Sequence, residues 1–219
     1  MSEVTNEDCM VGIARYPDKY FDLAIVDPPY GIGLDMVNNH GTFKTIHKEK
    51  GWNNQIPGPE YFEELYRVSK HQIIWGCNYY ASFIPAVGRI VHDKLLEIKD
   101  TALRYSECDL ASCSLQKRIT IFRYKWNGNV QGNTINWKNT GADARIHPTQ
   151  KPLALYRYLL TNYAKSGDKI LDTHLGSGSS RIAAHEMGFD FTGFELDKEY
   201  FDAQEKRFEK YLSQQVLFA

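Results

Sequence analysis

The chain contains 219 residues, of which 42% are hydrophobic, and its formal net charge is −1 at pH 7. This length suits one globular domain with a substantial core, so we expect a single domain over residues 1–219. No apolar run approaches the roughly 20 residues that cross a bilayer, and the first residues lack the pattern of a signal peptide. We therefore expect a cytoplasmic protein without a membrane partner. A chain so close to neutral can bind nucleic acid only through a local patch of positive charge.

The four cysteines form no Cys-x-x-Cys pair and no grouping with histidine at the spacing of zinc ligands. We interpret them as reduced and mostly buried thiols, as is usual inside a cell. The sequence therefore predicts no metal site.

The first half of the chain predicts two buried strands and one helix. Residues 21–26 are short and mostly apolar, which is typical of a parallel strand, and this run ends at Asp27. The polar segment 31–57 is long enough to be a functional loop, with an ordinary surface loop as the alternative. A helix is expected from Pro59, because proline suits the first helical position and an apolar stripe follows. Residues 72–75 are predicted to form the second strand.

The second half predicts helices and strands in regular alternation. Apolar residues at helical spacing follow Pro152. A strand, a helix, a strand and a charged helix are then expected at 169–172, 179–187, 189–194 and 198–212. Strands that alternate with helices imply an α/β fold, with a central and mostly parallel sheet and helices on both faces.

The middle of the chain is less regular and carries a local excess of positive charge. It contains one predicted strand at 119–124 and a turn-rich polar segment at 127–139. Between residues 111 and 151 there are seven basic residues and one acid. A solvated face and a surface for a nucleic-acid backbone are both open interpretations of such a run. The candidates for phosphate contacts are Lys117, Arg118, Arg123 and Lys125.

A glycine loop follows the predicted strand that ends at Asp172. Gly176 and Gly178 stand just before the next predicted helix. Glycines let a ligand approach the backbone, and a helix N-terminus offers N–H groups to an anion. Glu195, at the end of the following strand, can accept hydrogen bonds from the hydroxyls of a ribose. Arg181 replaces the third glycine of the dinucleotide fingerprint, which favours S-adenosylmethionine over a dinucleotide as the cofactor.

The tetrapeptide Asp27-Pro28-Pro29-Tyr30 follows a predicted parallel strand, at the edge where open α/β sheets bind ligands. The two prolines stiffen the loop and remove two N–H donors, so the Pro28 carbonyl can face an amino group. Asp27 supplies a second acceptor. Two acceptors on one exocyclic amine draw its nitrogen toward tetrahedral geometry and free the lone pair to attack a methyl group directly, without a covalent enzyme intermediate. Tyr30 offers a ring for a flipped-out base, a contact typically worth about 1 to 3 kcal/mol.

Together these residues resemble the β class of S-adenosylmethionine-dependent amino methyltransferases of DNA, over most of the chain. In that family the Asp-Pro-Pro-Tyr motif precedes the glycine loop, and a His-Pro-Thr-Gln-Lys-Pro motif introduces the helix before that loop. The chain matches this second motif at all six positions, from His147 to Pro152. The resemblance implies a circularly permuted, Rossmann-like class I methyltransferase fold. It also implies that the segment of approximately 95–145 is a recognition insertion that contacts DNA.

The resemblance assigns roles to individual residues. The catalytic positions are Asp27, Pro28, Pro29 and Tyr30. Thr149 and Lys151 are expected beside the methionine end of the cofactor, and the other cofactor positions are Asp8, Asp172, His174, Gly176, Gly178 and Glu195. The segment from Trp75 to Tyr79 resembles the support of the target-base pocket. The chain before Asp8 leaves little room for the strand that precedes this position in the family.

The first residue of the tetrapeptide bears on which amino group is methylated. In the family, serine at the first position of the tetrapeptide is usual for cytosine-N4 enzymes and asparagine for protein glutamine methylation, whereas this chain has Asp27. We therefore expect a site-specific DNA methyltransferase that acts on adenine N6, with cytosine N4 as the alternative. A homodimer and a partner restriction nuclease are both compatible with this role, in a bacterial cell or for a phage protein in its host.

The glycine loop departs from the family pattern. Thr173 and His174 replace the usual Pro-Phe, and His174 exchanges an apolar ring for one that can titrate near neutral pH. A catalytically weak DNA-binding or regulatory relative is therefore a further alternative.

Overall fold

The computed structural model describes residues 1–32, 54–95, 106–127, 130–131, 134–135 and 146–216. Most of the predicted loop at 31–57 lies outside these ranges, as do the basic residues Lys138 and Arg145. Across the described ranges, no helix combines the length and the apolar composition that crossing a bilayer requires.

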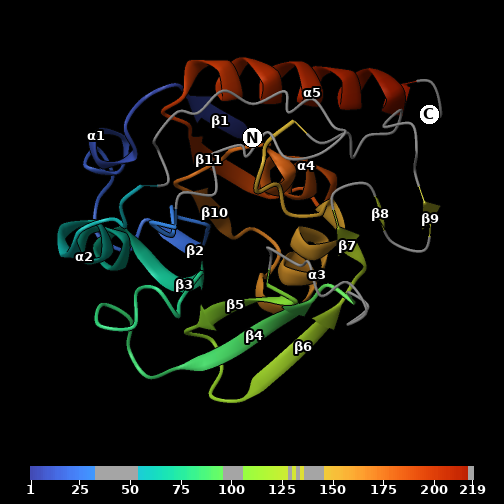
Figure 1. The fold of residues 1–219 in the computed structure, drawn as a ribbon. Coiled ribbons are helices and arrows are strands. Elements are labelled where there is room, and N and C mark those ends of the chain that lie inside the picture. The colour runs from blue at the N-terminus through green and yellow to red at the C-terminus, as the bar shows by residue number, and fades with distance from the viewer. Residues whose placement is uncertain (33–53, 96–105, 128–129, 132–133, 136–145, 217–219) are drawn as a thin grey trace.

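An eight-stranded sheet forms the centre of the protein (Figure 1). Its strand order is β1-β11-β10-β2-β3-β5-β4-β6. The bounds are β1 Ser2–Thr5, β2 Phe21–Val26, β3 Ser69–Trp75, β4 Gly88–Asp93, β5 Cys108–Cys113, β6 Ile119–Arg123, β10 Lys169–Asp172 and β11 Asp190–Phe194. All pairings are parallel except those of β5 with β3 and β4. The carboxyl ends of every strand but β5 therefore lie at one edge of the sheet.

Helices cover both faces of this sheet, as predicted. Their bounds are α1 Cys9–Ile13, α2 Pro59–Val68, α3 Leu153–Tyr163, α4 Ser179–Glu186 and α5 Lys198–Val216. Along β2, Leu23 and Ile25 join the core cluster that contains residues of α3, α4 and α5. Ala24 and Val26 join the second cluster, with residues of α1 and α2. A strand buried on both faces needs apolar residues at nearly every position, which explains the apolar run of β2 from Leu23 to Val26.

The structure confirms the predicted alternation of strands and helices from α3 to the C-terminal helix. It corrects one expectation at the N-terminus. The strand before Asp8 is present as β1, which pairs along its whole length with β11, from Ser2 opposite Phe191 to Thr5 opposite Phe194. Four residues suffice because an edge strand needs a partner on one side only.

The segment of about 95–145 is only in part an insertion. Its strands β5 and β6 belong to the main sheet, with β5 between β3 and β4. The chain leaves that sheet after β6 and forms a small antiparallel sheet from β7 (Trp126–Asn127), β8 (Val130–Gln131) and β9 (Thr134–Ile135). Strands β5 and β6 of this segment are therefore part of the main sheet, and the role of the segment in DNA recognition stays a prediction.

Candidate active site

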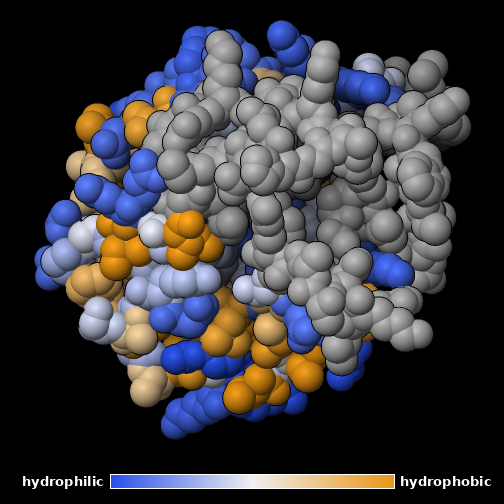
Figure 2. Space-filling model, viewed as in Figure 1, coloured by the Kyte–Doolittle hydropathy of each residue, from blue (hydrophilic) through white to orange (hydrophobic). Residues whose placement is uncertain are grey.

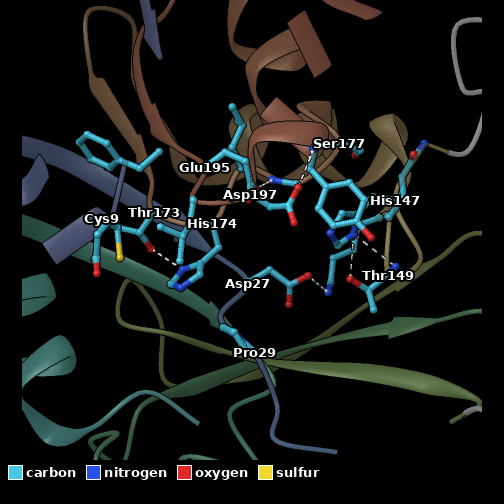
Figure 3. A pocket seen from close by; sticks show the side chains of 18 of the residues that line it. Cys9, Asp27, Pro29, His147, Thr149, Thr173, His174, Ser177, Glu195 and Asp197 are labelled. Atoms are coloured by element: carbon cyan, nitrogen blue, oxygen red, sulfur yellow. Dashed lines mark hydrogen bonds and ion pairs between the residues drawn. The ribbon is translucent and has the colours of Figure 1, made fainter. Parts of the chain in front are cut away.

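A cavity of about 740 Å³ opens where β2 and β10 lie side by side. The strands that follow these two in the chain extend the sheet in opposite directions, β3 on one side and β11 on the other. Such a switch point leaves a crevice at the carboxyl edge, which is where open α/β sheets bind their ligands. The cavity lies between the loop after β2 and the loop after β10, and Figure 3 shows Asp27 and Pro29 across it from Glu195 and Asp197.

Both carboxylate oxygens of Asp27 are engaged. The Tyr30 hydroxyl donates to Oδ1 at 2.5 Å. The Lys151 ammonium forms an ion pair with Oδ2, and its Nζ lies 3.1 Å from the Tyr30 hydroxyl oxygen. Burial, followed by the negative charge of Asp27, raises the pKa of Tyr30, so this hydroxyl stays a donor at neutral pH. Asp27, Tyr30 and Lys151 therefore form one hydrogen-bonded group, a contact that the sequence did not predict.

The Pro28 carbonyl already has a partner inside the protein, and its role as a second acceptor for an amino group stays a prediction, because a carbonyl oxygen has two lone pairs. The buried Tyr80 hydroxyl lies 2.6 Å from the Pro28 oxygen and 2.6 Å from the Pro29 oxygen. Tyr80 therefore fixes the turn from inside the protein, and Asp27 and Pro29 are the residues of this loop that line the cavity. Sequence reasoning missed Tyr80, although the preceding Trp75–Tyr79 segment pointed to the same place.

The ring of Tyr30 is already stacked on one side. Tyr79 lies against it with the ring centres 5.0 Å apart and the planes inclined by 18°. Gly76 packs under the same ring, because a Cβ built on it would approach a Tyr30 ring carbon to 2.3 Å. Tyr79 is 37% exposed, so the outer ring of the Tyr30–Tyr79 pair is open to solvent, although neither ring is among the residues that line the cavity.

The segment from His147 to Pro152 folds into a turn that delivers Lys151 to this site. The Gln150 backbone N–H donates to the His147 carbonyl at 3.2 Å, and the Gln150 side chain accepts from the Ile146 N–H at 3.0 Å. The Trp126 indole donates to the Gln150 carbonyl at 2.8 Å. Helix α3 then starts at Leu153, as the motif predicts.

The predicted cofactor positions divide into two groups. Those that line the cavity are Asp8, Thr149, Lys151, His174, Gly176 and Glu195. Asp172 and Gly178 are not among the lining residues. Asp172 is 1% exposed and holds the loop from behind, since it accepts from the Ser180 hydroxyl at 2.5 Å and from the His174 N–H at 3.1 Å. Burial raises the pKa of Asp172 to about 7.

The two glycines fulfil different conformational requirements. Gly176 has φ +53° and Gly178 has φ +72°, both in the region that favours glycine. Gly178 is the N-cap of α4. The Gly176 N–H donates to Glu195 Oε2 at 2.8 Å, so Glu195 orders the loop as well as facing the cavity.

His174 is not a group that titrates near neutral pH, which corrects the sequence interpretation. Burial lowers the pKa of His174 to about 4. Its Nδ1 lies 2.9 Å from the Thr173 hydroxyl oxygen, which in turn lies 2.6 Å from the Tyr61 hydroxyl oxygen. The Tyr61 ring meets the imidazole edge to face at 5.4 Å. His174 therefore serves as a neutral, hydrogen-bonded ring in the cavity wall.

The charge of the cavity wall indicates the kind of ligand that fits. Five carboxylate residues line it against two lysines: Glu7, Asp8, Asp27, Glu195 and Asp197, with Lys151 and Lys198. Such a wall repels a pyrophosphate and suits a ligand that carries a cationic centre and hydroxyl groups. Burial raises the pKa of Cys9, which also lines the cavity, to about 12, so this thiol is no nucleophile at neutral pH. Among the described residues, no group of histidine, cysteine and carboxylate side chains could hold a metal ion.

The four predicted phosphate contacts do not lie together. Lys117 and Arg118 precede β6, at the amino edge of the sheet and therefore opposite the Asp27–Tyr30 loop, and their contact with DNA stays a prediction. Arg123 and Lys125 lie at the carboxyl edge, and Arg123 Nε is 3.5 Å from Asp93 Oδ2. Figure 2 shows apolar side chains among polar ones over the region of β4 and β6, and Ile119 of β6 is 68% exposed.

Comparison with solved structures defines the fold class. The chain aligns with the crystal structure of the M1.HpyAVI–SAM complex at a TM-score of 0.58 and 18% identity, covering 95% of this chain and 99% of the other. It aligns with PvuII DNA methyltransferase, described as cytosine-N4-specific, at a TM-score of 0.60 and 12% identity, covering 94% and 85%. The architecture is that of a Rossmann-like class I methyltransferase.

Sequence comparison gives the family. Residues 74–206 match the family of N6 and N4 methyltransferases described as DNA methylase. The protein YubD of Escherichia coli (strain K12) is 28% identical over 220 residues, covering 94% of this chain and 90% of its own. The chain belongs to the N6/N4 DNA methylase family.

Proposed function

We propose that the protein transfers a methyl group from S-adenosylmethionine to adenine N6 of a base flipped out of DNA. The observation that carries this proposal is the Asp27 carboxylate, fixed at the edge of the cavity by Tyr30 and Lys151. Family membership supports the reaction class. The choice of base rests on the first residue of the tetrapeptide, and the roles of single residues rest on the chemistry of the site.

The cavity fits this cofactor by its size and by its polar groups. Its volume of about 740 Å³ is in the usual range for small-molecule sites. Glu195 can accept hydrogen bonds from the ribose hydroxyls, and Gly176 lets the nucleoside approach the backbone. The excess of carboxylates in the wall suits a sulfonium cation. S-adenosylmethionine, when bound, supplies a methyl group that is open to nucleophilic attack.

The side chains act on the amino group of the substrate. Asp27 accepts a hydrogen bond from one N–H of this amino group and so draws the nitrogen out of conjugation with the ring. The nitrogen gains the methyl group and must lose one proton, for which the Asp27 carboxylate is the nearest base that the loop offers. The Tyr30–Tyr79 pair supports the base by stacking. The Tyr80 hydroxyl restricts movement of the loop, because it lies within hydrogen-bond distance of the carbonyls of Pro28 and Pro29.

Adenine is the preferred acceptor because the first residue of the tetrapeptide is Asp27, where cytosine-N4 enzymes usually have serine. The fold itself does not discriminate, since PvuII methyltransferase, which is described as cytosine-N4-specific, aligns over 94% of the chain. The chain leaves the main sheet after β6, at the edge of the sheet where the cavity opens. We expect this part of the protein to contact DNA, through Arg123, Lys125 and the small sheet β7–β9.

The test is transfer of isotopically labelled methyl groups to mixed-sequence DNA, followed by digestion and mass spectrometry of the nucleosides. We expect labelled N6-methyldeoxyadenosine. Labelled N4-methyldeoxycytidine would refute the choice of base. Tight binding of S-adenosylmethionine without any transfer would favour a regulatory DNA-binding protein instead.

A further inference from the structure

Lys151 is a buried lysine whose ammonium group contacts the catalytic loop directly, through Asp27 and Tyr30. Its side chain is 6% exposed and forms an ion pair with Asp27. Its Nζ lies 3.1 Å from the Tyr30 hydroxyl oxygen and 5.3 Å from the centre of the Trp75 ring. A buried ammonium is unfavourable unless other groups replace its water, and here a carboxylate, a hydroxyl and an aromatic face do so.

This position conflicts with the entry of a substrate amine. Asp27 Oδ1 accepts from Tyr30 and Oδ2 pairs with Lys151, so an incoming amino group has to share an oxygen with one of these two donors or replace it. Tyr30 is held by its own short loop and by its stacking on Tyr79. Lys151 ends a flexible four-carbon side chain and lines the cavity into which it can withdraw. Lys151 is therefore the donor that gives way.

We propose that Lys151 occupies the amine subsite of the catalytic loop in the free protein and yields it to the amino group of the target base. This proposal rests on the proposed function and assigns Lys151 a second role beyond cofactor contact. The ammonium is a stand-in for the substrate amine, because both present N–H donors to Asp27 Oδ2. This exchange gives Asp27 a hydrogen-bond donor both before and after the base enters, so the carboxylate is never a buried, unpaired charge. Lys151 is a positioning residue.

Lys151→Met tests the proposal, because methionine keeps an apolar side chain of similar length and removes the N–H donors. The ligand pair is a duplex that carries the site found by sequencing, and the same duplex with the target adenine replaced by purine, which lacks the amino group. With cofactor present, the variant should bind the adenine duplex about 5-fold or more tighter than the unaltered protein does. The two proteins should bind the purine duplex with equal affinity. Lys165→Met, which removes an exposed lysine at the opposite edge of the sheet, should change neither affinity.

Two other results would overturn the proposal. Equal gains on both duplexes would mean that Lys151 does not compete with an amino group. A loss of S-adenosylmethionine affinity with unchanged DNA affinities would make Lys151 a cofactor contact alone. Transfer by the unaltered protein is measured separately: its absence refutes the proposed function, whereas these two results leave it intact.

Nitrogen-15 NMR of the lysine ammonium groups keeps the test open if Lys151→Met fails to fold. The free, unaltered protein should show a slowly exchanging ammonium signal that is absent in Lys151→Arg. The adenine duplex should shift this signal and the purine duplex should not. A signal that exchanges as fast as those of exposed lysines, or that responds equally to both duplexes, would contradict the proposal.

Discussion

The two loops at the switch point achieve their shapes in different ways. The loop after β2 is rigid through proline rings and through the side chains around it, with Asp27 held by Tyr30 and Lys151 and with both proline carbonyls facing Tyr80. The loop after β10 depends on its backbone, with two glycines at positive φ. Residues of both loops line the same cavity, but side-chain contacts hold the loop after β2 and backbone conformation shapes the loop after β10. Substitutions in the loop after β2 should therefore lower mainly the rate of transfer, whereas a substitution behind the loop after β10 should change the stability of the protein.

Asp27→Asn should have the largest effect on the catalytic side. Asparagine keeps the size of the side chain and one acceptor oxygen, but it removes the negative charge and the base that takes the proton from the substrate nitrogen. We expect the rate of methyl transfer to fall by about 10² to 10⁴-fold, while calorimetry gives nearly unchanged affinity for S-adenosylmethionine. Asp168→Asn, in the turn before β10 at the opposite edge, is the matched control. Near-normal transfer by Asp27→Asn would remove Asp27 from the mechanism.

Tyr80→Phe should have a smaller effect of the same kind. The change removes the hydroxyl that faces the carbonyls of Pro28 and Pro29, which should lower stability by about 1 kcal/mol and transfer by about tenfold. Tyr66→Phe is the control, because it removes a tyrosine hydroxyl that bonds the Phe83 carbonyl at 3.3 Å, away from the loop. Equal rates in the two variants would show that the turn needs no support from Tyr80.

Asp172→Asn probes the loop after β10 through its dependence on pH. Burial raises the pKa of Asp172 to about 7 from its usual 3.8, so the folded protein binds more protons than the unfolded chain between these values. The contribution of Asp172 to stability is therefore fully present below about pH 4 and is lost as the pH rises to 7. As the pH rises over this window, the free energy of unfolding of the variant should increase relative to that of the unaltered protein by up to a few kcal/mol, because one pKa unit corresponds to about 1.4 kcal/mol. Urea unfolding at pH 4.5 and pH 8 measures this, and a pH-independent difference would contradict it.

The basic residues should give the smallest and most local effect. Lys125 lies at the carboxyl edge near the cavity, whereas Arg118 lies at the amino edge. Lys125→Ala should lower the slope of log affinity for DNA against log salt by about 0.9, the value for one phosphate contact. Arg118→Ala should leave the slope unchanged. Equal changes would mean that DNA reaches both edges of the sheet.

The sequence predicts the parallel half of the sheet well, because β2, β3, β10 and β11 are buried and show as short apolar runs. Strands β4 and β5 escaped prediction. In β4 the buried Ile90 and His92 alternate with half-buried residues, and a buried histidine does not mark a strand in the sequence. The tetrapeptide and the six-residue motif located Asp27 and Lys151, but their pairing joins residues 124 positions apart and needs the fold. The low pKa of His174 likewise follows from burial, which composition does not reveal.

The most direct test of the central claim is methylation-sensitive sequencing of DNA from cells that express either the unaltered protein or Asp27→Asn. The account predicts N6-methyladenine at one recurring site with the unaltered protein, and its absence with the variant. Methylation at cytosine N4, or methylation that persists with Asp27→Asn, would contradict it.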